Sequence, residues 1–262
     1  MKFCISNLAW DIKDESKILN LLKNKIRFLE YSPSLLIKDI NSKKEIYKVK
    51  QVWKRRKISL YSMQSILYNV KNSYIFGSKI QRLNFYNEVK KKIILANKLN
   101  SKVIVFGSPK NKITFGNKKE VLDKMALDMF KKISLISKKY KIIFCLEANP
   151  KIYGSRYLTH TYDAIKFAKI INNRYFKVNL DLGTIISNNE DVNDLIKNNL
   201  KYFAHAQISS PKLKNLIKYK KKIREFLKIL SNHKYDNVIS IETLKKNKNN
   251  LSYIKNIIKL IN

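Results

Sequence analysis

Glycine is scarce in this sequence, with five residues in 262 and none before Gly77. A dinucleotide-binding fingerprint or a phosphate-binding P-loop needs several glycines close together at an early strand–helix turn. Both motifs are therefore excluded. The chain also has no apolar run long enough to span a membrane, and its start, MKFCISNLAW, lacks the apolar core and small-residue cleavage site of a signal peptide. We expect a cytoplasmic protein with no membrane partner.

Cysteine is nearly absent as well. The two residues, Cys4 and Cys145, lie inside apolar runs, which predicts buried thiols in a reducing compartment. No Pro-, Gly- or Ser-rich linker divides the chain, and its length suits one α/β barrel. The sequence therefore predicts a single domain over residues 1–262.

Acidic residues are few: 19 against 55 Lys and Arg, for a net charge of +36. Such a charge attracts phosphate at long range. However, 48 of the basic residues are Lys and 7 are Arg, and the accompanying abundance of Ile and Asn indicates drift toward AT-rich codons. Arg is the residue that reads guanine by paired hydrogen bonds. We therefore expect no nucleic-acid partner, although the charge could draw in an anionic substrate such as a sugar phosphate.

The sequence does contain a regular alternation of short apolar runs and longer amphipathic stretches. Apolar residues in the longer stretches recur at three- and four-residue spacing, which is typical of helices. The expected strands are Lys2–Ser6, Arg27–Tyr31, Ile58–Met63, Val103–Phe106, Ile142–Leu146, Phe176–Leu180, Tyr202–Ile208 and Val238–Ile241. The expected helices are Asp14–Lys25, Asn84–Leu99, Glu120–Tyr140, Thr161–Asn172, Val192–Asn199 and Leu213–Asn232, with the charged segment Lys38–Lys54 left undecided. Eight such units predict an α/β fold, an eight-stranded parallel (β/α)8 TIM barrel, with a doubly wound open sheet as the competitor.

Three of the few acids follow apolar strands directly. Glu147 lies in LEANP after the fifth strand, Asp181 in NLDLGT at the sixth, and Glu242 in SIETL after the eighth. Strand ends meet on the active face of a TIM barrel, where three acids would repel one another unless a cation or protons lay among them. Oxygen ligands of this kind suit Mg²⁺ or Mn²⁺. The alternative is that each acid caps a helix or pairs with a lysine.

The same motifs carry a resemblance. ISNLAWD at Ile5–Asp11, YSMQSILY, KVIVFGSPKN, CLEANPKIYG at Cys145–Gly154, NLDLGT, QISSPKL and SIETL follow one another in order over nearly the whole chain. In this respect the sequence resembles the sugar phosphate isomerase/epimerase branch of the xylose-isomerase-like TIM barrels, relatives of tagatose epimerase and hydroxypyruvate isomerase. Spacings of 34, 26 and 35 residues separate Glu147, Asp181, Gln207 and Glu242, in keeping with that resemblance.

The resemblance implies a metal-dependent isomerase or epimerase that acts on a small sugar or sugar phosphate through an enediolate. Glu147 and Glu242 would be the catalytic acid–base pair, and Mn²⁺ or Mg²⁺ would be bound by Glu147, Asp181, Gln207 and Glu242. A homodimer is expected by analogy.

The chain departs from the family where a metal histidine stands in the motif H-I-S-E-P, because that position is Gln207 here and the following Glu is Ser210. Thr184 and Leu213 replace a substrate-binding His and Arg. His205, two residues before Gln207, points to the same face by strand alternation. The expected substrate contacts are Asn7, Trp10, Gln64, Ser108, Asn149 and His205.

Three other functions stay open. A catalytically degenerate sugar-binding barrel would explain Gln207. An apurinic endonuclease of the same fold would suit the basic charge, but its metal cluster needs more than the three histidines present. A dehydratase or lyase would begin with the same proton abstraction.

Overall fold

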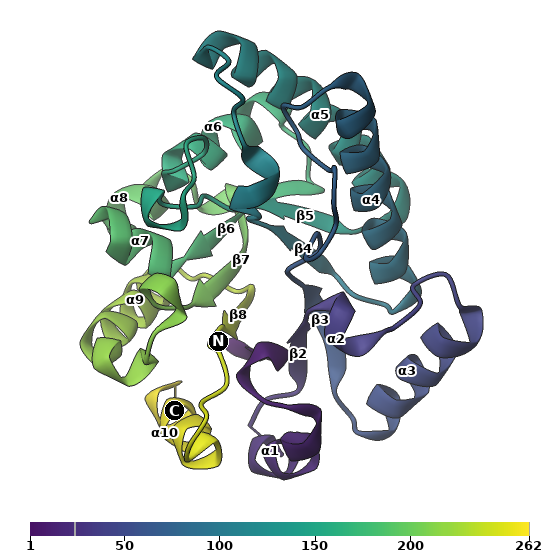
Figure 1. Cartoon of the computed structure of the whole chain (residues 1–262). Coiled ribbons are helices and arrows are strands. Elements are labelled where there is room, and N and C mark those ends of the chain that lie inside the picture. Colours follow the sequence, from purple (N-terminus) through teal and green to yellow (C-terminus); the bar gives the residue numbers. More distant parts are fainter. Residues whose placement is uncertain (24, 262) are drawn as a thin grey trace.

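Eight parallel strands close into a barrel in the order β1-β2-β3-β4-β5-β6-β7-β8, with helices on the outside (Figure 1). The computed structural model describes residues 1–23 and 25–261. The strands are β1 Lys2–Ser6, β2 Phe28–Tyr31, β3 Ser59–Met63, β4 Val103–Phe106, β5 Ile143–Leu146, β6 Phe176–Asp181, β7 Phe203–Ile208 and β8 Val238–Ile241. The ring closes where β1 pairs with β8, in a register that sets Lys2 opposite Val238.

The helices between the strands cover the outer face of the barrel. They are α1 Glu15–Leu22, α2 Pro33–Leu36, α3 Lys43–Arg55, α4 Lys79–Lys98, α5 Lys119–Tyr140, α6 Thr161–Ile171, α7 Leu182–Asn188, α8 Val192–Lys197, α9 Lys220–Asn232 and α10 Asn250–Ile261. Short 3₁₀ turns lie at η1 Asn7–Ala9, η2 Ile12–Asp14, η3 Pro109–Lys112, η4 Lys151–Tyr153, η5 Leu200–Tyr202, η6 Pro211–Leu213 and η7 Leu216–Tyr219.

Strand alternation divides the core into two layers. In β4, Val103 and Val105 pack with Cys145 and Ala204 in one small buried cluster. Phe106, from the other face of the same strand, joins the large cluster that includes the helices. Because successive side chains of a strand point to opposite faces, the first cluster fills the barrel and the second binds the helices to it.

The expected fold is confirmed, and the strand bounds agree to within one residue. β1, β4 and β8 begin and end where the sequence predicts. The undecided segment Lys38–Lys54 contains α3, which begins after the N-cap Ser42. The expected helix Asp14–Lys25 is shorter, and its residue Asn24 lies outside the described residues.

Several helical regions differ from the prediction: α2 was not expected, and α4 begins at Lys79, five residues before the predicted start at Asn84. The expected helix Leu213–Asn232 begins at Lys220, because Lys212 and Leu213 have left-handed backbone angles (φ of 56° and 49°) that an α-helix cannot continue through. α7 and α10 were not expected from the sequence. α7 has seven residues, which is too short for helical periodicity to show.

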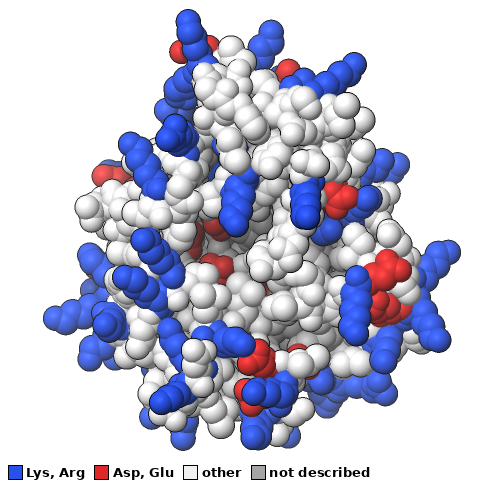
Figure 2. Space-filling view, in the orientation of Figure 1, with Lys and Arg blue, Asp and Glu red and all other residues white. Residues whose placement is uncertain are grey.

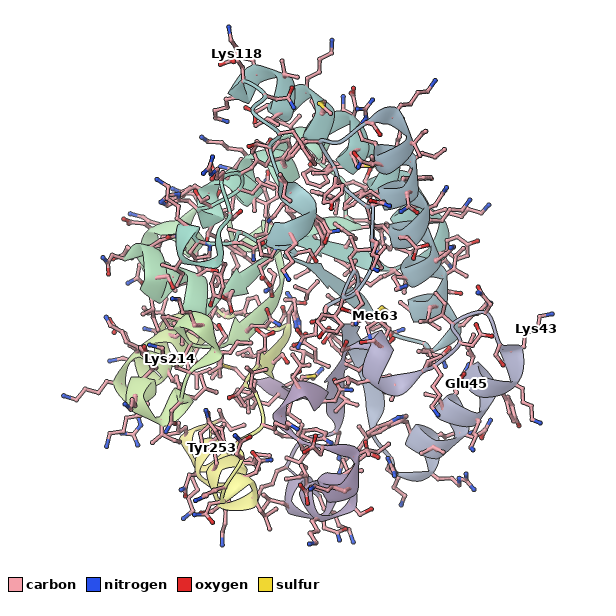
Figure 3. All side chains as sticks on the ribbon, in the orientation of Figure 1. Lys43, Glu45, Met63, Lys118, Lys214 and Tyr253 are labelled. Atoms are coloured by element: carbon pink, nitrogen blue, oxygen red, sulfur yellow. The ribbon has the colours of Figure 1, made fainter. Side chains whose placement is uncertain are left out.

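On the face that Figure 2 shows, basic side chains are scattered around the periphery, and acidic side chains show in a hollow near the centre of the barrel. Met63 is buried at the end of β3, whereas Lys43 and Lys118 extend outward at the periphery (Figure 3). No helix within the described ranges is both long and apolar enough to cross a bilayer. Basic side chains also lie beside the hollow in Figure 2, so positive charge is present close to the acids of the mouth.

Candidate active site

The three acids predicted from strand ends meet at the carboxyl-terminal mouth of the barrel. Glu147 directly follows β5, and its N–H donates to the Phe106 carbonyl at 2.9 Å. Glu242 follows β8, and its N–H donates to the Ile208 carbonyl at 3.0 Å. Asp181 is the last residue of β6. Because each backbone is held by the neighbouring strand, the side chains are placed by the sheet rather than by a loose loop.

Asp181 is both a member of this group and a helix cap. Its Oδ2 accepts the N–H of Thr184 at 2.8 Å, which caps α7, and its Oδ1 accepts the hydroxyl of Ser209 at 2.5 Å. Burial raises the pKa of Asp181, and the donated hydrogen bonds partly oppose the rise. The capping expected from the alternative interpretation is therefore present.

Glu147 accepts two side-chain amides. Asn179 donates to its Oε2 at 2.8 Å, and Asn149 donates to its Oε1 at 3.3 Å. Burial and repulsion from Asp181 raise the pKa of Glu147 to about 8. Burial, with repulsion from Glu147 and Asp181, raises the pKa of Glu242 well above its ordinary value. Electrostatic repulsion among the three carboxyl groups therefore contributes to the raised pKa values of Glu147 and Glu242.

Gln207 is held by hydrogen bonds at both ends of its amide. Its Oε1 accepts from Asn179 Nδ2 at 2.5 Å, and its Nε2 donates to Glu30 Oε1 at 2.8 Å. His205 lies deeper in the barrel, with no exposed surface, and its Nε2 is 2.9 Å from Glu30 Oε2. Gln207 and His205 thus share a face, as predicted, and both turn toward Glu30.

Glu30, at the end of β2, is the centre of this buried network. Ser62 donates to its Oε2 and Ser240 to its Oε1, each at 2.8 Å. Burial alone would raise the pKa of Glu30, but hydrogen bonds and charge from His205, with hydrogen bonds from Gln207 and Ser62, leave it below the ordinary value. The neighbouring donors therefore stabilise the ionised form of Glu30, which accepts their hydrogen bonds, although the group is buried inside the barrel.

The other expected substrate contacts divide into two groups. Gln64 and Asn149 join the acid network, since Gln64 Nε2 donates to Ser6 Oγ at 2.6 Å and Asn149 reaches Glu147. Asn7 accepts the Ser32 N–H at 2.9 Å, so its side chain orders a loop. Trp10 is buried, and Ser108 follows β4 with a left-handed φ of 45°.

Four residues of the site were not predicted: Glu30, Lys112, Asn179 and Ser209. Glu30 carried a signal, because it is an acid within the apolar run FLEY. Asn179 stands two residues before Asp181 and so shares its face. Lys112 is buried, its Nζ donates to the Glu147 carbonyl at 3.2 Å, and burial lowers its pKa to about 7. In a lysine-rich chain nothing distinguishes it.

The donor chemistry of the mouth fits a hard divalent cation. Glu147, Asp181 and Glu242 are oxygen ligands that repel one another, which a cation would relieve. As they stand, however, no three His, Cys, Asp or Glu side chains in the described part of the chain are arranged to hold a metal ion. The carboxylates would have to turn inward to share an ion, and Gln207 Oε1 already faces Asn179.

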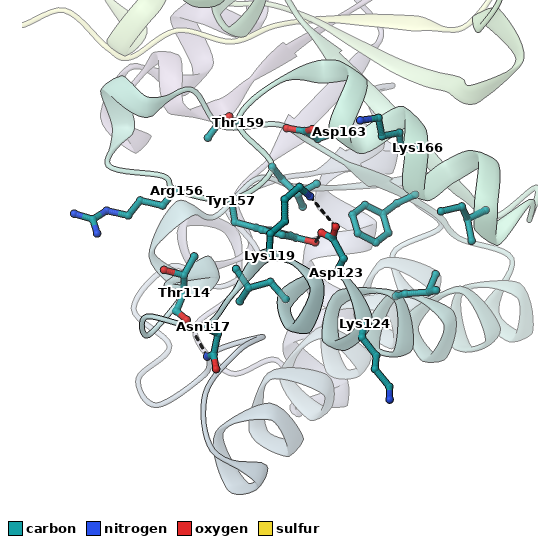
Figure 4. A pocket seen from close by; sticks show the side chains of 15 residues that line it. Thr114, Asn117, Lys119, Asp123, Lys124, Arg156, Tyr157, Thr159, Asp163 and Lys166 are labelled. Carbon is teal, nitrogen blue, oxygen red and sulfur yellow. Dashed lines mark hydrogen bonds and ion pairs between the residues drawn. The ribbon is translucent and has the colours of Figure 1, made fainter.

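A second cavity, of about 640 Å³, lies on the outside between α5 and α6 (Figure 4). Tyr157 donates to Asp123 at 2.6 Å within it, and Lys119 pairs with the same carboxylate at 2.7 Å. Its described lining does not include Glu147, Asp181 or Glu242. The cavity is therefore separate from the barrel mouth.

A closed parallel barrel with strand-end carboxylates defines a TIM-barrel protein with an enzyme-like mouth. The family model described as xylose isomerase-like TIM barrel matches residues 27–261, and the chain belongs to that family. The resemblance noted in the sequence is confirmed at this level.

Similar solved structures show the same fold. One is 3-keto-D-glucoside 4-epimerase from E. coli, at a TM-score of 0.81 and 14% identity, covering 100% of this chain and 99% of that one. A D-psicose 3-epimerase has a TM-score of 0.78 and 16% identity, with 99% of this chain and 90% of that one covered. A family 2 AP endonuclease from Brucella melitensis has a TM-score of 0.72 and 15% identity, with 95% of this chain and 96% of that one covered. No curated protein matches the sequence.

Proposed function

We propose that the protein is a sugar isomerase or epimerase that moves a proton next to a carbonyl group. The convergence of Glu147, Asp181 and Glu242 at the barrel mouth carries the proposal. Proton transfer of this kind needs two carboxyl groups that hold and release protons near neutral pH. The similar folds of a D-psicose 3-epimerase and a 3-keto-D-glucoside 4-epimerase support a small sugar or sugar phosphate as the substrate.

The surroundings of the two glutamates suggest how the work is divided. Asn179 and Asn149 both donate to Glu147, and such donors limit the rise in its pKa that burial and repulsion from Asp181 cause. Burial, together with repulsion from Glu147 and Asp181, favours the protonated form of Glu242. Glu147 would therefore take the proton from the carbon next to the carbonyl, and Glu242 would return one to the enediolate. Return to the same carbon from the opposite face gives epimerisation, and return at the neighbouring carbon gives isomerisation.

A divalent cation, Mn²⁺ or Mg²⁺, is part of the proposal. Glu147, Asp181 and Glu242 would hold it, and Gln207 would be the fourth ligand through the lone pair of Oε1 that does not accept from Asn179. When bound, the cation would stabilise negative charge on the substrate oxygens as a Lewis acid. Metal analysis of protein purified without chelator tests this part. About one equivalent, lost in Glu147→Gln, would support it, and no uptake of added Mn²⁺ would overturn it.

Isotope exchange tests the chemistry directly. Keto sugars and their phosphates would be incubated in D₂O with Mn²⁺, and deuterium entering next to the carbonyl would be followed by NMR. We expect exchange in the parent protein and a loss of about 100-fold or more in Glu147→Gln and Glu242→Gln. Glu120→Gln, an exposed acid in the first turn of α5, is the matched control and should keep the parent rate.

One observation favours a second function. Both amide atoms of Gln207 are engaged by Asn179 and Glu30, as expected of a barrel that binds sugar without catalysis. Sugar binding by calorimetry with no isotope exchange would establish that function. The AP endonuclease neighbour carries less weight, because the described residues hold no multi-histidine cluster for its metals.

A further inference from the structure

Two amide side chains form a directional chain between the buried carboxylate of Glu30 and the half-buried carboxylate of Glu147. Gln207 Nε2 donates to Glu30 Oε1 at 2.8 Å, and Gln207 Oε1 accepts from Asn179 Nδ2 at 2.5 Å. The same Nδ2 donates to Glu147 Oε2 at 2.8 Å. The chain joins β2, β7 and β6 to the residue after β5, and Glu30, Gln207 and Asn179 are all buried.

The direction of the chain is set at the Glu30 end. Besides Gln207, four donors converge on this carboxylate, so Glu30 acts as an acceptor; they are His205, Ser62, Ser240 and Gln64. A reversed Gln207 amide would place its oxygen against a carboxylate oxygen, which is repulsive. Gln207 must therefore present its oxygen to Asn179.

Asn179 in turn must present its amide nitrogen to both Gln207 and Glu147. This leaves Asn179 Oδ1 buried without a hydrogen-bond partner among the described residues. An unsatisfied buried acceptor costs free energy. The neighbours therefore hold Asn179 in an orientation that its own hydrogen bonding does not favour.

We propose that Glu30 is a positioning residue for Glu147, acting through Gln207 and Asn179. It keeps an N–H donor on Glu147 Oε2, which fixes the rotation of that carboxylate. Its relevance to catalysis rests on the proposed role of Glu147, whereas the chain itself can be tested without a substrate. In this account Gln207 is a link of the chain, occupying the place where the resemblance puts a metal histidine.

The side-chain amide of Asn179 reports on the chain. In ¹⁵N-labelled protein, its NMR signal is expected to exchange slowly with solvent in the parent. Glu30→Gln, which has the same shape but can also donate, should move that signal and speed its exchange about tenfold, as loss of one hydrogen bond implies. An unchanged Asn179 signal in folded Glu30→Gln would overturn the proposal.

Two further variants complete the test. Ser62→Ala removes a donor to Glu30 that is not on the path to Glu147, so it should leave the Asn179 signal in place. Gln207→Leu cuts the chain in the middle and serves if Glu30→Gln does not fold, and it should reproduce the tenfold change. A response to Ser62→Ala equal to that of Glu30→Gln would show general loosening of the barrel and would also overturn the proposal.

The NMR and isotope-exchange results separate the two proposals. An Asn179 response without catalysis in any sugar would keep the chain and reject the proposed function. Catalysis together with an unchanged Asn179 signal in the variants would support the proposed function and reject the hydrogen-bonded chain. If both hold, Glu30→Gln should lower kcat with little change in KM, because Glu30 does not contact the substrate.

Discussion

The backbone of Gly107 lies directly against the carboxylate of Glu147. A Cβ atom at Gly107 would stand 2.5 Å from Glu147 Oε1 and 2.9 Å from Asn149 Nδ2, which is far inside contact distance. Only glycine therefore fits at position 107 without displacing the side chain of Glu147. Any larger residue would displace the proposed base.

Gly107→Ala is therefore expected to lower the isotope-exchange rate about 100-fold, since a shift of about 1 Å in a reacting group costs that much. Gly116→Ala is the matched control. A Cβ there meets nothing within 4 Å, but φ is +75°, so it should cost about 1–2 kcal/mol of stability and leave the rate alone. Equal rates in the two variants would show that Glu147 is not the base.

Replacing Gln207 with His should strengthen metal binding. An imidazole at this place could donate one N–H to Glu30, whose carboxylate is 2.8 Å from Gln207 Nε2, and present its other nitrogen to a cation. We expect Mn²⁺ affinity to rise by about tenfold, or about 1.4 kcal/mol, by calorimetry. Unchanged affinity would show that side chain 207 does not face the cation.

The raised pKa values of the carboxyl groups at the barrel mouth predict that these groups lower the stability of the folded protein as the pH rises. The pKa of Glu147 is about 8 in the folded protein, against about 4.3 in an unfolded chain. As pH rises between these values, the unfolded state ionises first, so this group progressively destabilises the fold and the effect is complete above about pH 8.

Glu147→Gln should consequently be more stable than the parent at pH 8, by about 0.5–2 kcal/mol, and no more stable at pH 4. Urea unfolding in the presence of a chelator measures both differences. Exposed Glu120→Gln should show neither. A parent that is the more stable protein at pH 8 would contradict the burial and repulsion described for Glu147.

Both cysteines should be chemically silent in the folded protein. Cys4 and Cys145 are free and buried, as the sequence predicts, and burial raises the pKa of each thiol. Since the thiolate is the reactive form, a thiol reagent at pH 8 should label neither residue before unfolding and both in guanidinium chloride. Rapid labelling of the native protein would show that the barrel interior opens.

The strands could be predicted closely because each is a short apolar run bounded by polar residues, as VIVF in β4 shows. Helix α7 could not, because its first residues also complete the Asp181 motif and its length hides any period. The acids at strand ends were visible because acids are rare in this chain. Asn179 and Lys112 could not be recognised as site residues, because Asn and Lys are abundant throughout the sequence. Their roles depend on which strands become neighbours.

The pairing of β1 with β8 has a consequence for synthesis of the protein. Lys2 can meet Val238 only after the chain has been synthesised through β8 and this segment has left the ribosome. Until then the nascent sheet has two open edges, and the apolar interior between them is accessible to other chains. Folding in the cell should therefore depend on chaperones that shield an unfinished barrel, and a chain that stalls before β8 should aggregate.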